Sequence, residues 1–225
     1  MKLILSGIPL STLISISNFY YSQHYWIKNI NIINVENGEV LKNQHVKIEK
    51  GKIVSIVEKV KKVKSEIING QGKYLIPGLW DMHVHLDMVG EASMPLFLNY
   101  GITGVRDMGG DINVIKKYKK QPEIPTIISA GAILESPRFY QIVSMLLGEE
   151  VAKSRVPFGD PTEAGQLVDS LVASGSDFIK IRTDASQEVF EALGRACKER
   201  GVTFSGHIDR NIDFMTTIKS GIGSI

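Results

Sequence analysis

The stretch Tyr74–Asp87, which reads YLIPGLWDMHVHLD, decides how the rest of the chain is interpreted. A turn at Pro77-Gly78 leads into a run in which His83 and His85 alternate with apolar residues. Side chains of a strand alternate between two faces, so both imidazoles are expected on one face. Same-face Cα atoms lie about 6.6 to 6.8 Å apart, and two such rings can reach one ion at about 2.1 Å each. The pattern predicts a metal-binding pair at a strand end.

The neighbours of this pair favour a ligand site over an ordinary strand surface or hydrogen-bonded core histidines, which are the usual settings of a lone His-x-His. Val84 and Leu86 are expected in the core, while Asp81 and Asp87 crowd the face that carries the two imidazoles. Several polar groups gathered on one face of a strand indicate a common ligand.

The composition is that of an enzyme-like globular chain. It has 225 residues, 43% hydrophobic residues and a formal net charge of +2, so no broad charge bias points to nucleic acid as a partner. Basic residues cluster at 59–64 and 116–120, but apolar residues interrupt both runs, which favours a solvated strand end and a helix end. The single cysteine, Cys197, excludes an internal disulfide and a multi-cysteine zinc cluster, and its helical spacing from Phe190 and Leu193 predicts a core residue.

Residues 1–23 predict a secretory signal peptide, and therefore an exported, periplasmic or secreted protein. Lys2 precedes a mostly apolar stretch from Leu3 to Ile16 that contains no acidic residue. This stretch is shorter than the roughly 20 residues that a membrane-spanning helix needs, so no stable span is expected after signal removal. A buried N-terminal strand or a retained membrane anchor is the alternative.

Two regions follow the leader. Residues 24–76 contain short β-rich runs separated by turn signals at 36–38 and 50–51, which predict hairpins of a small antiparallel β unit. Residues 77–225 alternate strands with helices, which predicts parallel pairing with right-handed crossovers. Expected strands lie at 101–106, 126–130, 177–182 and 202–207, and expected helices begin at Asp111, Asp160, Ser186 and Asp213. The segment Glu135–Phe158 lacks strict periodicity and is expected to be a long loop with some helix that covers the substrate.

Three of these strands bring candidate ligands to one place. His83 and His85 end the first strand, Lys180 faces inward between Ile179 and Ile181, and His207 ends a later strand. In a parallel barrel the carboxyl ends of the strands meet at one mouth. A buried ammonium is costly, so Lys180 either pairs with Asp81 or Asp107 or is modified to serve as a metal ligand.

Taken together, the motifs resemble the amidohydrolase superfamily, and in particular the imidazolonepropionase-like and prolidase-like metal-dependent hydrolases. The resemblance covers nearly everything after the leader and rests on Gly72–Asp87, GITGVRDMGG at 101–110, DFIK at 177–180 and SGH at 205–207.

The resemblance implies an α/β fold, a (β/α)8 TIM-type barrel attached to a small β-sandwich. It implies that His83 and His85 bind one divalent metal, usually zinc, that a CO2-derived carbamate on Lys180 bridges to a second, and that His207 binds the second. A metal-activated hydroxide would then hydrolyse a C–N bond of an amide, a cyclic amide or a dipeptide, including Xaa-Pro and N-acyl amino acids. Arg182 can bind a substrate carboxylate, although a structural salt bridge is an equal alternative.

The chain departs from the family pattern in its second half. The pattern has a further His after the next strand and a general-base Asp after the last strand, both expected beyond Ile225, and residues 77–225 supply about five strands. We expect the chain to be the N-terminal portion of a longer enzyme, which the coding DNA past Ile225 would test. The alternative is a catalytically inactive truncated metal-binding or interaction module. No G-x-x-x-x-G-K-[ST] or G-x-G-x-x-G motif supports nucleotide chemistry.

Overall fold

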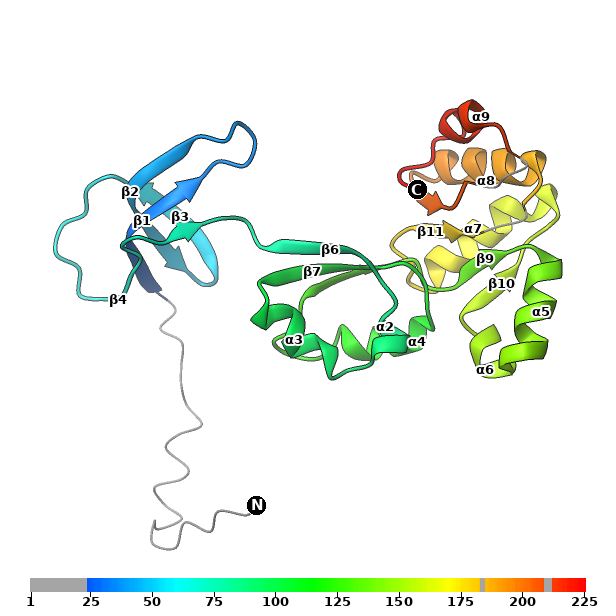
Figure 1. Cartoon of the computed structure of the whole chain (residues 1–225), viewed down its shortest axis with the longest axis horizontal. Helices are drawn as coiled ribbons and strands as arrows, with labels where there is room; N and C mark the ends of the chain where they lie inside the picture. Colours follow the sequence, from blue (N-terminus) through cyan, green and yellow to red (C-terminus); the bar gives the residue numbers. More distant parts are fainter. Residues whose placement is uncertain (1–23, 183–184, 209–211) are drawn as a thin grey trace, which may run out of the picture. The chain divides into compact units, whose positions relative to one another are not determined.

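The computed structural model describes residues 24–182, 185–208 and 212–225, and the chain divides into two compact units between Pro77 and Gly78 (Figure 1). The signal peptide predicted at residues 1–23 lies outside the described residues. None of the helices in the described ranges is long and apolar enough to cross a membrane.

The first unit is a five-stranded sheet. Its strands are β1 (His24–Ile33), β2 (Val40–Glu49), β3 (Lys52–Val57), β4 (Glu66–Asn69) and β5 (Tyr74–Leu75), in the order β3-β2-β1-β4, with β5 also paired to β1. Strands β2 and β3 are joined by Lys50-Gly51, whose φ angles of 50° and 74° suit the two-residue turn of a hairpin. Ile30, Val46 and Ile48 form the small core of this sheet.

The prediction of an antiparallel unit is correct only for its first three strands. Strand β1 pairs antiparallel with β2, and β2 with β3, but β4 and β5 both run parallel to β1. A period-2 pattern identifies a strand but carries no information on which neighbour it joins or in which direction, because the pairing of β4 with β1 joins residues about 40 positions apart.

The second unit alternates strands with helices. Its strands are β6 (Leu79–Val84), β7 (Ile102–Asp107), β8 (Thr126–Ser129), β9 (Ile133–Glu135), β10 (Arg155–Pro157), β11 (Ile179–Ile181) and β12 (Phe204–Gly206). Its helices are α2 (Leu86–Val89), α3 (Ser93–Asn99), α4 (Ile112–Tyr118), α5 (Pro137–Leu147), α6 (Glu149–Ala152), the 3-10 turn η2 (Pro161–Glu163), α7 (Ala164–Ala173), α8 (Gln187–Glu199) and α9 (Phe214–Lys219). All of the strand pairs of this unit are parallel, as the alternation predicts.

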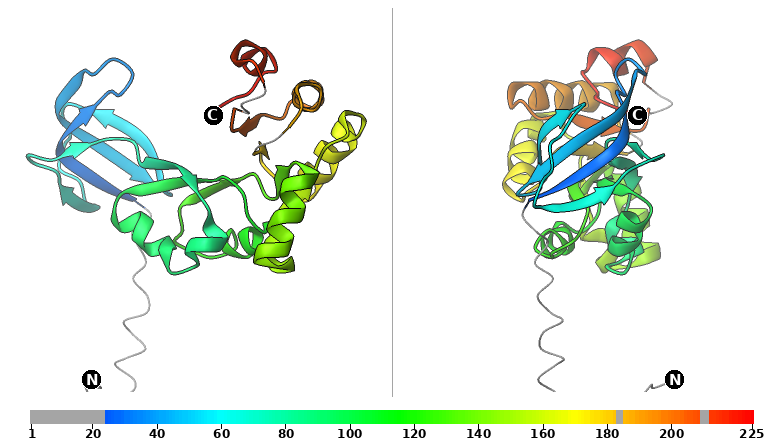
Figure 2. Two further views of the ribbon diagram at one scale, coloured as in Figure 1. Left: turned by 45° about the vertical axis from the view of Figure 1, so that its right-hand side comes forward. Right: turned by 90° about the vertical axis from the view of Figure 1, so that its left-hand side faces the viewer.

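The strands of this unit form two sheets, in the orders β6-β7-β8 and β10-β9-β11-β12. Helices α3 and α4 lie along one side of the first sheet (Figure 1), where Val105 and Ile115 are fully buried. Helices α7 and α8 lie next to each other on the second sheet (Figure 2), and Phe190 of α8 packs edge-on against Phe204 of β12 with ring centroids 5.4 Å apart. Cys197 is 1% exposed in this core, and its burial raises the pKa of its thiol to about 12, so the prediction of a core cysteine is confirmed.

The strand predicted at 126–130 corresponds to β8, and a strand that was not predicted, β9, follows it closely. Strand β8 pairs with β7, and after a break at 130–132 strand β9 pairs with β10 and β11. Main-chain hydrogen bonds tie the break to its surroundings, from the Ala130 N–H to the Asp107 carbonyl (3.0 Å) and from the Gly110 N–H to the Gly131 carbonyl (2.9 Å). Strands β8 and β9, only three residues apart in the sequence, therefore belong to different sheets.

The prediction of a long loop with some helix at 135–158 is confirmed for the helix and wrong for the loop, because most of the segment is regular structure. It contains α5, α6 and β10. Helix α5 begins with Ser136, whose hydroxyl accepts a hydrogen bond from the Phe139 N–H, and Pro137 occupies the first turn. Gly148, with φ of 82°, ends the helix.

Candidate metal centre

The four residues predicted as metal ligands line one cavity of about 710 Å³ in the second unit: His83, His85, Lys180 and His207. His83 and His85 come from the carboxyl end of β6, Lys180 from the middle of β11, and His207 directly follows β12. The remaining wall is formed by Asp87, Met88, Gly109, Ile133, Leu147, Glu150, Ser154, Arg155 and Arg182. Parallel pairing is what gathers these strand ends on one side of the unit.

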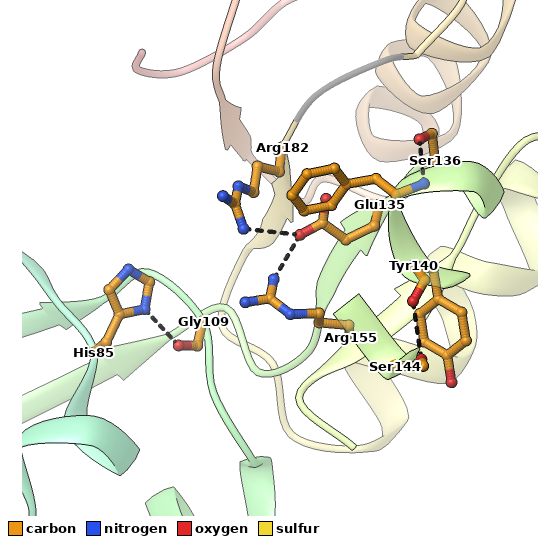
Figure 3. Close-up of polar contacts among 9 residues, drawn as sticks. His85, Gly109, Glu135, Ser136, Tyr140, Ser144, Arg155 and Arg182 are labelled. Carbon is orange, nitrogen blue, oxygen red and sulfur yellow. Dashed lines mark hydrogen bonds and ion pairs between the residues drawn. The ribbon is translucent and has the colours of Figure 1, made fainter. Parts of the chain in front are cut away.

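The imidazole of His85 is held in one orientation. Its Nδ1 lies 2.7 Å from the Gly109 carbonyl oxygen, to which the ring donates (Figure 3). This hydrogen bond fixes the proton on Nδ1 and leaves the Nε2 lone pair for a ligand. The backbone on either side is also fixed, because the Val84 carbonyl accepts from the Met108 N–H at 2.8 Å and the Leu86 N–H donates to Asp107 Oδ1 at 2.9 Å.

The rings of His83 and His85 approach edge to face, with centroids 5.6 Å apart. Both His83 and His207 stay accessible on the cavity side, yet partial burial, followed by the positive charge of Lys180, lowers the pKa of each imidazole. Both effects favour the neutral ring. A neutral imidazole is the form that donates a lone pair to a metal.

Lys180 is 3% exposed, and its side chain has neighbours that disfavour an ammonium. Burial, followed by the positive charges of Arg106 and Arg182, lowers its pKa to about 8, and Glu135 acts in the opposite direction. Neither Asp81 nor Asp107, proposed above as ion-pair partners of Lys180, forms a salt bridge with it in the described part of the chain. A lysine with a substantial neutral amine fraction is the form that reacts with CO2 to give a carbamate.

Asp81 and Asp107 instead support the backbone around the histidines. Asp81 Oδ1 accepts from the His83 N–H at 3.1 Å. Asp107 is fully buried, and its second oxygen accepts from the Ser129 hydroxyl at 2.6 Å. Asp107 therefore links the end of β6 to β7 and β8, whereas Asp81 acts within β6.

Arg106, whose charge acts on Lys180 and His83, was not singled out from the sequence. Its Nε donates to the Met82 carbonyl at 2.8 Å, and its Nη1 donates to the Ser224 hydroxyl, also at 2.8 Å. Ser224 in turn bonds to Ser205 of β12 at 2.9 Å and forms a parallel bridge with it. One guanidinium thus links β6 and β7 to the far end of the second sheet across 118 positions of sequence.

Glu135 and Arg155 were also missed. Glu135 Oε1 lies 2.5 Å from Arg155 Nη1 and 3.4 Å from Arg182 Nη1, so one carboxylate serves two guanidiniums (Figure 3). Arg182 therefore forms a salt bridge with Glu135, which is the structural alternative named for it in the sequence analysis. Burial raises the pKa of Glu135 even though Arg182 and Arg155 lower it, which means that the loss of water outweighs the attraction of the two cations. The only signal in the sequence was a lone acid at the end of an apolar strand.

The chemistry of the donor set fits a divalent metal. The imidazoles of His83, His85 and His207 and a lysine suited to carbamate formation supply the nitrogen and oxygen ligands that zinc and similar ions accept. In the described part of the chain, no three His, Cys, Asp or Glu side chains gather closely enough to hold an ion by themselves. A complete ligand set from these residues therefore has to include Lys180.

Comparisons with known proteins point the same way, although no family model matches the chain. The chain is 49% identical over 59 residues to a dihydroorotase of Carboxydothermus hydrogenoformans, covering 26% of this chain and 14% of that protein. It is 37% identical over 75 residues to a 5-methylthioadenosine/S-adenosylhomocysteine deaminase of Caldanaerobacter subterraneus, covering 33% and 16%. A prolidase solved in complex with N-methylphosphonate-L-proline matches with a TM-score of 0.71 and 18% identity, covering 88% of this chain and 59% of the prolidase.

The fold and the cavity define an α/β protein that carries histidines and a buried lysine at the carboxyl ends of parallel strands. The curated relatives agree with the resemblance to the amidohydrolase superfamily found in the motifs, and the solved prolidase shows the same fold over 88% of this chain. The chain spans 59% of the prolidase and smaller shares of the curated relatives.

Proposed function

We propose that this chain carries the metal-binding half of a metal-dependent hydrolase that cleaves a C–N bond of an amide, a cyclic amide or a dipeptide. The observation that carries the proposal is the common cavity of His83, His85, Lys180 and His207 at the carboxyl ends of parallel strands. The relatives named above support it, because they are a dihydroorotase, a deaminase and a prolidase. In the same proposal, the second unit is part of a (β/α)8 barrel and the first is part of a β-sandwich.

His83, His85 and His207 would hold one or two divalent ions, zinc in the first instance, and a carbamate on Lys180 would join the two. When bound, the metal supplies a nucleophile at neutral pH and an electrophile for the carbonyl oxygen of the substrate. The chain's own residues do the rest. The Gly109 carbonyl keeps the His85 proton on Nδ1, and partial burial lowers the pKa of His83 and of His207, which favours their neutral rings.

Burial of Lys180 matters for the same reason. An ammonium at this position costs solvation free energy, whereas a carbamate is an anion that a cationic centre stabilises. The two nearby guanidiniums, Arg106 and Arg182, also favour an anion at this position. Formation of the carbamate joins the uncharged Lys180 Nζ to the carbon of CO2 and releases one proton.

Metal content tests this proposal without any substrate. The chain is purified, equilibrated with zinc, dialysed, and analysed by plasma mass spectrometry. We expect one or two zinc ions per chain, loss of at least one in His83→Gln and His207→Gln, and no change in the control His45→Gln, whose imidazole lies in the first unit and accepts a backbone hydrogen bond from Asn29. Absence of zinc from the folded wild-type chain, or equal binding by all four proteins, would refute the proposal.

Carbamate formation has its own readout. Incubation with ¹³C-bicarbonate should give a carbamate carbonyl signal in the ¹³C NMR spectrum of the wild-type chain. The signal should be missing from Lys180→Gln, and its presence there would assign the carbamate to another amine.

A further inference from the structure

Helix α5 carries an apolar stripe that the described part of the chain leaves uncovered. Ile142, Met145 and Leu146 are separated by three and four positions, so they share one face of the helix. All three are exposed, whereas Val143, on the opposite side, is buried. The helix lies at the outer edge of the second unit (Figure 1). We call these three exposed residues the α5 stripe.

The α5 stripe is distinct from the cavity of the candidate metal ligands. Leu147, the next residue along the chain, lines that cavity, but none of the three residues of the stripe does so. Single apolar residues are common on protein surfaces, whereas a contiguous group of large apolar side chains marks a contact with another macromolecule. The stripe therefore calls for a partner outside the cavity.

Unpaired charges of opposite sign lie at the two ends of the α5 stripe. Arg138 belongs to the first turn of α5, and Glu149 follows Gly148, which ends the helix. Both side chains are exposed, and among the described residues neither forms a salt bridge. The stripe is thus framed by one cation and one anion that are available to a partner.

The order of these residues is self-complementary. In two antiparallel α5 helices with a two-fold axis halfway between Ile142 and Met145, Ile142 of each copy is level with Met145 of the other. Arg138 lies four residues before Ile142 and Glu149 four residues after Met145, so each arginine is level with the glutamate of the other copy. Since a two-fold interface joins the same patch to itself, the pair has an apolar centre flanked by two opposite-charge contacts.

The same charges disfavour a membrane as the partner. Glu149 and Glu150 both stand at one end of the stripe, and their carboxylates would be repelled by the negative surface of a membrane that contains anionic lipids. A second copy instead brings a cation to the anionic end and an anion to the cationic end. Charge complementarity of this kind fixes the orientation of two partners.

We propose that the α5 stripe is the interface of a homodimer. Ile142, Met145 and Leu146 of two copies pack across a two-fold axis, and Arg138 of each copy pairs with Glu149 of the other. A single pair of helices buries a small area, so the dimer is weak and its dissociation constant lies in the micromolar range. The interface is independent of the proposed metal chemistry.

Sedimentation equilibrium of the full chain over a series of concentrations tests the dimer. We expect the mass to rise from that of one chain to that of two. Met145→Lys should weaken the association at least about tenfold, because it places an ammonium in the apolar contact. The control Met215→Lys changes an exposed methionine of α9 and should leave the dissociation constant unchanged. Circular dichroism checks that each variant is folded.

Exchange of the charges tests the antiparallel arrangement. Arg138→Glu and Glu149→Arg should each weaken the dimer about threefold or more, since either change sets like charges opposite each other at both ends of the interface. The double variant restores opposite charges and should recover the wild-type dissociation constant. Loosening of the fold by the single changes would not be repaired in this way.

A chain that stays monomeric at every concentration, a dimer that Met145→Lys does not weaken, or a double variant that associates no better than the single ones would each overturn the inference. Phosphatidylcholine vesicles test the other occupant. Co-sedimentation of the wild-type chain, but not of Met145→Lys, with these vesicles would assign the stripe to a membrane and would overturn the homodimer as well.

Discussion

Removal of the Glu135 carboxylate should destabilise the second unit more than an ordinary surface ion pair would suggest. The Glu135 side chain is 0% exposed and that of Arg155 is 13% exposed, so the Glu135–Arg155 pair is buried on both sides. Replacement of Glu135 by Leu leaves the Arg155 guanidinium without a counter-charge in a place where water cannot solvate it.

The magnitude follows from the burial of each partner. Breaking a buried pair by removing one partner costs about 3 to 5 kcal/mol, whereas the 3.4 Å contact to the partly exposed Arg182 contributes at most about 1 kcal/mol after screening by solvent. We therefore expect Glu135→Leu and Arg155→Leu each to lower the free energy of unfolding by about 3 kcal/mol or more. The double variant removes both charges and should lie within about 2 kcal/mol of the wild type, which gives a coupling free energy of at least about 4 kcal/mol.

Urea denaturation measures these differences. Trp80 lies in the second unit and Trp26 in the first, so a Trp26→Phe background lets tryptophan fluorescence report on the second unit alone. The midpoint multiplied by the slope gives each free energy of unfolding. A single variant within about 0.5 kcal/mol of the wild type, or costs that simply add in the double variant, would show that Glu135 and Arg155 are not coupled as the buried geometry requires.

Three further outcomes are expected. Gly194→Ala should lower the free energy of unfolding by about 1 to 3 kcal/mol in the same denaturation assay, since the added Cβ would lie 2.3 Å from the Ser220 carbonyl oxygen. The control Gly165→Ala should be close to neutral, because its Cβ meets only the end of the flexible Arg200 side chain. Burial raises the pKa of Asp107 above its ordinary 3.8, so the folded state keeps the Asp107 proton to higher pH than the unfolded state. The free energy of unfolding should therefore fall as the pH rises from the unfolded pKa through the folded pKa, and Asp107→Asn should lack this pH dependence. Chelation of bound zinc should lower the melting temperature, by the equivalent of about 2.7 kcal/mol if free zinc stands at 100 times its Kd, and an unchanged melting curve would contradict a stabilising ion.

Much of the second unit was predictable because its signals are local. Asp111 caps α4 by accepting from the Asn113 N–H, and Ser186 caps α8 by accepting from the Val189 N–H. The alternation of Lys180 with buried Ile179 and Ile181 was readable for the same reason. Caps and strand periods involve residues within a few positions of one another, so the sequence contains both partners of each interaction side by side.

The bounds of helix α5 were not predicted although its first and last residues carry standard signals. The apolar residues at its carboxyl end are turned outward, with Met145, Leu146 and Leu147 being 79%, 70% and 61% exposed, and Val143 is the one residue of this helix buried in the described structure. Apolar residues on the solvent side obscure the 3.6-residue period on which helix recognition relies. Ser136 as cap, Pro137 in the first turn and Gly148 at the end were the better guide.

The Glu135 cluster was out of reach for a different reason. Its arginines lie 20 and 47 residues away along the chain, and they meet only because β9 is flanked on both sides by parallel partners. Arg155 is in register with Ile133 on one side, and Ile181, the residue before Arg182, is in register with Leu134 on the other. Glu135 ends the central strand and is therefore reached by both arginines at once. The same register places Lys180 beside Ile133 on the cavity wall. Long-range strand pairing therefore makes the ion cluster unpredictable from the sequence, and the same pairing brings this cluster next to the candidate metal ligands.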